Sequence, residues 1–311
     1  MTTCTILVVG ATGQQGSAVI DALAELAPAA PDKIKVLALT RNASSQKAQA
    51  LATKHTSLYL DVIEGNVLNP EPIFDAHPEI QRVFSFTSPP NEVPQATALI
   101  DASIKAGVSH FVFSSVERGG DEKSWTNPTQ TPHFAEKHEI ELYLRDQCNK
   151  HKTDAEKGMT WTILRPTAFM DNFNPTSPFG AAFAALLSTM PASQKLQVVS
   201  VRDIGRFAAK ALLNPKAFAG RAIGLAGDEI TLGDARATYR RVTEGLELPQ
   251  AWWIVGKGLR WAINDVGRMF DWFESDGYGV DIAALRKEEP ELQDLEKWLK
   301  ESSRFDCGLG K

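Results

Sequence analysis

The stretch Gly10-Ala11-Thr12-Gly13-Gln14-Gln15-Gly16 decides the fold of this chain. It follows the apolar run 6–9 and opens a helical pattern with apolar residues on one face, at Val19, Ile20, Leu23 and Leu26. A strand, a glycine turn and an amphipathic helix form the context in which such a turn binds a dinucleotide. The glycines let the backbone approach a pyrophosphate, and the helix N-terminus supplies N–H groups for that anion. A tight turn that merely starts a helix is the alternative.

Length and composition place the chain among globular proteins with a sizeable core. It has 311 residues, of which 43% are hydrophobic, enough for one large α/β domain or for two parts. The net charge is −5 and there is no basic block, which argues against direct binding of nucleic acid. No apolar run is long enough to span a bilayer, so we expect no membrane partner.

Cysteine usage predicts the compartment. The three cysteines are odd in number, far apart and without a C-x-x-C pair: Cys4, Cys148 and Cys307. Neither a disulfide framework nor a zinc site is indicated, and we expect no metal. A cytoplasmic protein is therefore predicted, with the nucleus as a second reducing compartment. The first predicted strand begins close to Met1, so we expect no signal peptide.

Apolar runs alternate with helical patterns through the first half of the chain. The predicted strands are 4–9, 34–40, 58–63, 82–87, 110–115 and 160–164. The predicted helices are 14–27, 44–54, 92–106 and 133–149. This alternation predicts an α/β fold, a doubly wound Rossmann-type parallel sheet with helices on both faces.

The regular alternation of strand and helix patterns ends after Arg165-Pro166. A strand at 195–200, a helix at 202–213 and a strand at 221–225 then indicate a return to the sheet. We therefore predict a dinucleotide-binding domain over 1–165, completed by about 194–225. A smaller, mostly helical part for a substrate or protein partner is predicted over 166–193 and 226–311. Within it, Thr231 begins a helix, with Asp234 as an approximate capping box.

The C-terminal tail is rich in tryptophan. Five of the seven tryptophans lie in 250–311, at Trp252, Trp253, Trp261, Trp272 and Trp298. A well-buried helical subdomain is the first interpretation of this cluster. A substrate pocket or the face of a homodimer is the alternative.

Residues after the strands predict which dinucleotide binds. We expect contacts from the glycine turn, at Gly10, Thr12, Gly13, Gln14, Gln15 and Gly16. After the second strand the chain offers Arg41, with Lys47 nearby, where an acidic residue would bind the ribose 2′-OH of NAD. An arginine there suits the 2′-phosphate of NADP(H). A solvated loop arginine is the alternative. Asn66 would lie beside the adenine, and Thr87 where the nicotinamide half passes.

The spacing G-x-x-G-x-x-G resembles that of the short-chain dehydrogenase superfamily. Ser114 and Ser115 point to opposite faces at the carboxyl end of the fifth predicted strand, where open α/β sheets bind ligands. One of them, with Ser115 preferred, is placed like the active-site serine of the superfamily. A serine that only ends the strand is the alternative.

The resemblance continues on the next predicted helix, with one departure. The superfamily has Tyr-x-x-x-Lys there, with both side chains on one face. This implies that Lys137 binds the nicotinamide ribose, while His133 stands in the place of the tyrosine. An imidazole can donate a proton near neutral pH, or His133 can merely cap the helix after Pro132. The stretch His138-Glu139-Ile140-Glu141 is not a metal-binding motif.

Three further stretches resemble the NmrA-like family, an atypical branch of that superfamily: 162–173, 201–206 and 269–273. The resemblance covers about residues 4–299. It implies that the dinucleotide is lined by Gly10, Thr12, Gly13, Gly16, Arg41, Lys137, Phe169 and Asn172.

Two functions of different class follow from this reading. One is an NADP(H)-dependent reductase of a small carbonyl or unsaturated substrate, with His133 or a water as the proton source. The other is a sensor that reports NADP(H) status to a regulated protein partner, because the family contains regulators that bind dinucleotide without turnover. The retained Lys137 favours the enzyme, and the missing tyrosine favours the sensor.

Overall fold

The computed structural model describes residues 3–30, 32–55, 58–151, 158–243, 245–248 and 253–303. Trp252 and Cys307 lie outside these ranges. The chain divides into two compact units that interleave along the sequence. Unit 1 comprises Met1–Ser115, Glu136–Arg165 and Ile204–Ile223. Unit 2 comprises Val116–Ala135, Pro166–Asp203 and Gly224–Lys311.

A seven-stranded sheet carries the predicted α/β fold. Its order is β3-β2-β1-β4-β5-β6-β9, and every register pair from β3 to β6 is parallel. The strands are β1 (Thr3–Val9), β2 (Lys33–Thr40), β3 (Tyr59–Glu64), β4 (Ile80–Phe86), β5 (His110–Ser114), β6 (Thr160–Pro166) and β9 (Arg221–Leu225). The doubly wound, Rossmann-type sheet expected from the sequence is confirmed.

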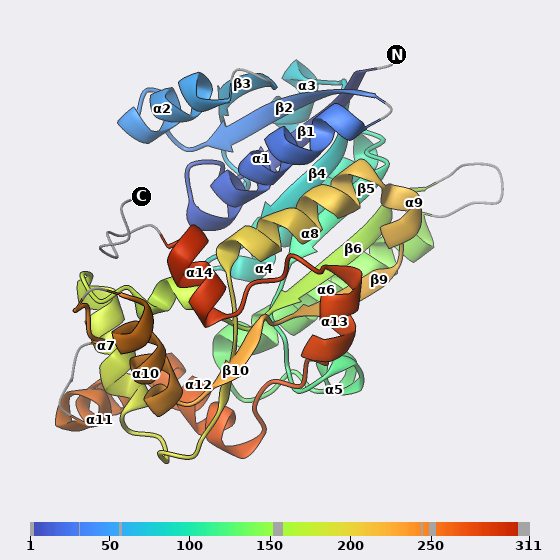
Figure 1. The fold of residues 1–311 in the computed structure, drawn as a ribbon. Coiled ribbons are helices and arrows are strands. Elements are labelled where there is room, and N and C mark those ends of the chain that lie inside the picture. The colour runs from blue at the N-terminus through green and yellow to red at the C-terminus, as the bar shows by residue number, and fades with distance from the viewer. Residues whose placement is uncertain are drawn as a thin grey trace. The chain divides into compact units, whose positions relative to one another are not determined.

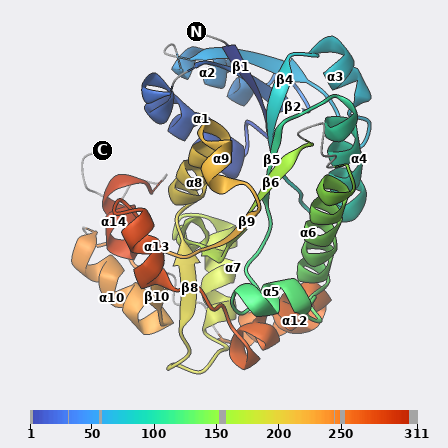
Figure 2. The same cartoon turned by 90° about the vertical axis from the view of Figure 1, so that its right-hand side faces the viewer.

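Helices cover both faces of this sheet (Figures 1 and 2). α1 (Gln14–Leu26) and α8 (Val201–Leu213) lie on one face, and α4 (Glu92–Lys105) and α6 (Pro132–Lys150) on the other. The shorter helices are η1 (Ala27–Ala29), α2 (Gln46–Lys54), α3 (Glu71–Ala76) and α9 (Pro215–Phe218). Because both faces are covered, the central strands bury continuous runs, and every residue of β5 is buried.

Unit 2 has a sheet of its own, with the order β10-β8-β7. Its strands are β7 (Ala168–Phe169), β8 (Leu196–Val199) and β10 (Asp228–Ile230). The strand predicted at 195–200 therefore forms, but the expectation that it joins the large sheet is wrong. β8 pairs with β10 and β7 instead, because a strand pattern specifies an extended segment and not its partner.

The rest of unit 2 is mostly helical. Its helices are α5 (Asp121–Thr126), η2 (Met170–Phe173), α7 (Pro178–Leu187), α10 (Leu232–Val242), α11 (Trp253–Ala262), α12 (Asn264–Ser275), α13 (Ile282–Glu288) and α14 (Leu295–Glu301). The predicted capping box is present at α10, where Thr231 and Asp234 bond reciprocally. No described helix is long and apolar enough to cross a membrane.

The tryptophans of the tail divide into two groups. Trp272 and Trp298 belong to the hydrophobic core of unit 2, as the buried interpretation predicts. Trp253 and Trp261 on α11 are instead 53% and 89% exposed, so that interpretation is wrong for them. The helix packs on α7, and Gly256 lies against the backbone carbonyl of Ala185.

Candidate functional site

The glycine turn has the geometry of an anion-binding helix start. Gly10 has a φ of +63°, in the left-handed region that glycine adopts without a steric cost. The N–H of Gly13 donates to the Gly10 carbonyl at 2.8 Å, which closes the turn. Gly13 is the N-cap of α1 and provides no side-chain cap to the first N–H groups of the helix. These N–H groups suit a phosphate.

Close packing explains why side chains are excluded from two positions of the turn. A Cβ at Gly10 would lie 2.6 Å from the ring of Phe86. A Cβ at Gly16 would overlap the carbonyl group of Gly10. The first helical turn therefore packs directly on the strand end, as dinucleotide-binding turns require.

A cavity of about 430 Å³ opens above this turn, within the usual range of ligand pockets. It lies entirely in unit 1 and is formed by the carboxyl ends of β1, β2, β3 and β4. The lining residues are Val9, Gly10, Thr12, Gly13, Leu39, Thr40, Arg41, Lys47, Gly65, Asn66, Val67, Phe86, Ser88 and Gln95. The carboxyl ends of parallel strands are the expected position for a ligand.

The charges on the cavity wall have one sign. Arg41 and Lys47 line it, no acidic residue does, and neither cation forms an ion pair with a described residue. Two exposed cations without carboxylate partners favour an anionic ligand. The Asn66 side-chain oxygen accepts from the Leu68 N–H at 3.0 Å, which shapes the loop after β3.

The predicted cofactor residues fall into several groups. Five line the cavity: Gly10, Thr12, Gly13, Arg41 and Asn66. The others of unit 1 do not line it: Gln14, Gln15, Gly16, Thr87 and Lys137. Phe169 and Asn172 lie in unit 2, on β7 and η2.

Sequence reasoning missed Phe86 and Gln95 in the wall. Phe86 ends β4, at the sheet edge where ligands bind, so its position was a usable signal. Gln95 donates to the carbonyls of Ser88 and Pro90, at 2.9 and 2.8 Å, and so holds the loop between β4 and α4. No sequence pattern marks that contact.

Lys137 lies in a buried polar cluster of unit 1. Its ammonium donates to the backbone oxygen of Thr87 at 3.0 Å and to the hydroxyl of Thr87 at 2.8 Å. It also pairs with Glu92 at 3.0 Å, and the Thr87 hydroxyl donates to the same carboxylate at 2.7 Å. Lys137 is 3% exposed and Glu92 is fully buried.

These contacts occupy the three N–H donors of an ammonium group and join α6 to both ends of the β4–α4 loop. Burial lowers the pKa of Lys137, and the Glu92 carboxylate opposes that shift. The cluster thus fixes the loop that contributes Ser88 to the cavity wall.

Ser114 and Ser115 point to opposite faces, as predicted. The hydroxyl of Ser114 donates to the Gln15 side chain at 2.6 Å, on the side of α1. The hydroxyl of Ser115 donates to Glu141, which also accepts from Arg165 at 2.8 Å. All three residues of this second cluster are buried. The contact is structural, and the catalytic role of Ser115 stays a prediction.

His133 lies at the start of α6, in the part of that helix that belongs to unit 2. Its backbone N–H donates to Asp265 at 3.4 Å. The ring of the neighbouring Phe134 packs edge-on against Trp272, with centroids 5.2 Å apart. The helix start is thus anchored in the aromatic core of unit 2.

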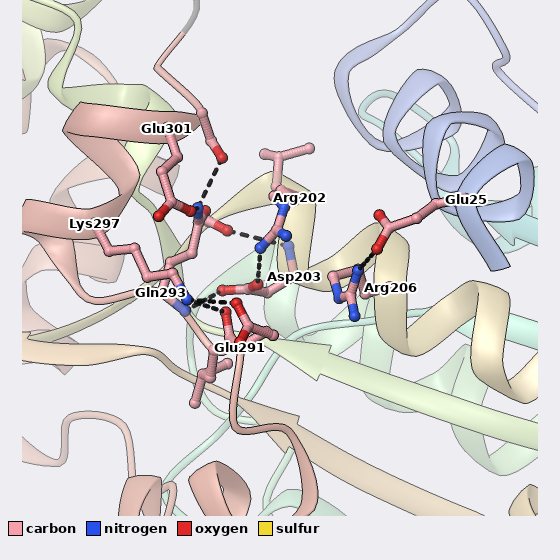
Figure 3. A network of polar contacts seen from close by, with 12 residues as sticks. Glu25, Arg202, Asp203, Arg206, Glu291, Gln293, Lys297 and Glu301 are labelled. Carbon is pink, nitrogen blue, oxygen red and sulfur yellow. Dashed lines mark hydrogen bonds and ion pairs between the residues drawn. The ribbon is translucent and has the colours of Figure 1, made fainter. Parts of the chain in front are cut away.

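The Asp-Ile-Gly-Arg stretch of α8 has structural contacts within each unit (Figure 3). In unit 2, Asp203 accepts from the backbone N–H of Gln293 at 2.9 Å. In unit 1, Arg206 pairs with Glu25 at 2.5 Å. Gly205 packs against the carbonyl of Ala18, where a Cβ would overlap that group. This motif therefore positions α8 against its neighbours.

Comparison with known proteins adds a family and a fold. A model described as the NmrA-like family matches residues 2–250. An NAD(P)H azoreductase of Xenophilus azovorans is 29% identical over 217 residues, which are 68% of this chain and 64% of that protein. The chain thus matches less than two thirds of that relative's length.

Two solved structures share the fold across nearly the whole chain. NmrA, a negative transcriptional regulator solved with NADP, aligns over 97% of this chain and 96% of its own, with a TM-score of 0.65 and 18% identity. It was also solved with NAD. The Citrobacter sp. triphenylmethane reductase, complexed with NADP(H), aligns over 96% and 98%, with a TM-score of 0.68 and 17% identity.

Proposed function

The chain belongs to the NmrA-like family of NAD(P)-binding proteins, and from this premise we propose that it is an NADP(H)-dependent oxidoreductase. The proposed reaction moves a hydride between NADPH and a small carbonyl or unsaturated substrate. The azoreductase and the triphenylmethane reductase, similar to this chain in sequence and in fold respectively, are both named as reductases.

The cavity of unit 1 carries the proposal. Its glycine turn offers an uncapped helix start for a pyrophosphate, and Arg41 and Lys47 offer unpaired cations for a 2′-phosphate. An enzyme specific for NAD would place an acidic side chain after β2 to bind the ribose 2′-OH, and this wall has none. The residues present thus fit NADP(H) better than NAD(H).

The chain's own residues have separate roles in this proposal. The reduced nicotinamide supplies a hydride when it is bound. Lys137 fixes the β4–α4 loop and, as the family resemblance implies, binds the ribose, which would replace one of its present acceptors. His133 donates a proton to the substrate atom that gains negative charge.

A second candidate is a sensor that binds NADP(H) and reports it to a protein partner. The observation that favours it is His133, which stands where the related dehydrogenases have a tyrosine one helical turn before Lys137. The tyrosine is the proton donor of those dehydrogenases, so its absence fits a protein that binds the dinucleotide without catalysing a reaction. The regulator NmrA shares the fold.

NADPH oxidation across ketones, quinones and enones tests the proposal. We expect turnover with at least one of these classes, and His133→Ala should lower the rate roughly 10²–10⁴-fold, the usual contribution of acid catalysis. NADPH affinity should barely change in this variant, because the imidazole is assigned to the substrate. NADPH binding without oxidation in the whole panel would contradict the enzyme and favour the sensor.

A further inference from the structure

A second cavity, of about 260 Å³, lies wholly within unit 2. It is bounded by η2, the end of α7, the start of β8 and the start of α10. The lining residues are Phe173, Leu187, Ser188, Met190, Pro191, Ala192, Gln194, Leu196, Ile230, Thr231, Leu232, Gly233 and Arg236. None of them lines the cavity of unit 1.

The walls of this cavity are mainly apolar and well supported. Phe173, Leu187, Met190 and Leu196 are buried members of the core of unit 2. The ring of Phe173 packs edge-on against Phe183, with centroids 5.2 Å apart. A wall made from core side chains keeps its shape, as ligand pockets usually do.

Arg236 is the single charged residue among these lining residues. Its Nε is buried and has no hydrogen-bond partner among the described residues. The nearby carboxylate of Asp234 turns back to Thr231, whose backbone N–H and hydroxyl donate to it at 3.0 and 2.7 Å. Arg241 on the same helix, by contrast, pairs with Glu296 at 2.6 Å.

Arg236 is half-buried and forms no hydrogen bond or ion pair with another described residue, so this wall offers an unpaired guanidinium to a ligand. The planar guanidinium is suited to a carboxylate, which accepts two parallel hydrogen bonds. The apolar walls suit a hydrocarbon body.

We propose that this cavity binds a small organic carboxylate with one ring or a short apolar chain. An apolar cavity of about 150 Å³ holds a benzene molecule, so the larger volume here leaves room for a ring and an acidic arm. The carboxylate would meet Arg236, and the ring would lie against Phe173 and Leu187. The proposal does not depend on the reaction proposed for unit 1.

Binding of phenylacetate and of its neutral analogue phenylacetamide to the full chain tests this proposal. Ligand-observed NMR titrations should show saturable binding of phenylacetate, at least about tenfold tighter than the amide, because a charge-assisted hydrogen bond has this effect on affinity. Arg236→Gln should remove the preference for the acid. Arg236→Lys, which keeps the charge but not the planar fork, should retain part of it.

Arg240→Gln is the matched control, because Arg240 lies one turn further along α10, is exposed and does not line the cavity. It should leave both affinities unchanged. Circular dichroism of each variant checks that α10 still forms. Equal affinity for acid and amide, an acid preference that survives Arg236→Gln, or the absence of saturable phenylacetate binding would each overturn the proposal.

Discussion

At the scale of single residues, the sequence predicted a role for Lys137 and Thr87 but not for Glu92, which contacts both of them. Glu92 opens α4, where an acidic residue is expected merely to face the positive end of the helix dipole. Its ion pair with Lys137 depends on how α4 and α6 pack on the sheet, which no local pattern specifies. Lys137 and Thr87 could thus be singled out from the sequence, whereas their buried partner could not.

Removal of the Lys137 ammonium should separate its structural role in the buried cluster from its proposed contact with the cofactor. Lys137→Met leaves the Glu92 carboxylate buried without its ion pair, which should lower the free energy of unfolding by about 3–5 kcal/mol. The double variant Lys137→Met with Glu92→Gln should recover much of that loss. NADPH affinity, measured by calorimetry, should stay weak in the double variant. Full affinity there would contradict a direct contact between Lys137 and the cofactor.

His110 gives unit 1 a pH-dependent stability. The imidazole is fully buried between Thr160 and Thr162, at 2.8 and 3.1 Å. Burial, with a smaller contribution from the Arg82 guanidinium, lowers its pKa from 6.5 to about 4. The folded state therefore binds fewer protons than the unfolded state between these two values.

The stability that depends on neutral His110 is present above about pH 6.5 and is lost as the pH falls through 4. A shift of this size corresponds to about 3 kcal/mol. Urea unfolding of the wild type and of His110→Gln, which cannot titrate there, measures it. The difference in free energy of unfolding should fall by about 3 kcal/mol from about pH 7 to about pH 4. A difference that does not change with pH would refute this assignment.

At the scale of elements, the glycine turn was predictable because its constraints are local. Gly16→Ala places a methyl group against the Gly10 carbonyl and should lower the free energy of unfolding by about 1–3 kcal/mol. It should also weaken the affinity for NADPH. The matched control is Gly258→Ala on α11, where a Cβ meets no atom within 4 Å. That change should stabilise the chain by about 0.5–1 kcal/mol. Equal effects of the two substitutions on thermal unfolding would contradict the close packing of the turn.

Other elements escaped prediction for reasons that differ. α5, of six residues, is too short to show a helical period in the sequence. No individual helix was predicted over 166–193, where α7 lies. Its start nevertheless has recognisable signals, since Ser177 caps the helix and Pro178 is its first residue. The membership of β8 in the smaller sheet is set by non-local pairing, which local patterns do not reveal.

At the scale of the whole molecule, the alternation of strands and helices predicted the parallel sheet, because parallel strands need crossover connections. It also predicted that binding residues gather at the carboxyl ends of the strands, and the cavity of unit 1 lies there. The smaller cavity of unit 2 could not be anticipated. Phe173, Leu196 and Arg236 come from separate segments that meet only after folding.

The central claim is that the cavity of unit 1 binds NADP(H) and that Arg41 recognises its 2′-phosphate. Calorimetric titration of the full chain with NADPH and with NADH tests this claim most directly. We expect roughly ten- to a hundredfold tighter binding of NADPH, the effect of a charge-assisted hydrogen bond, and a ratio near one in Arg41→Ala. Binding of neither dinucleotide, or an unchanged ratio in Arg41→Ala, would contradict it.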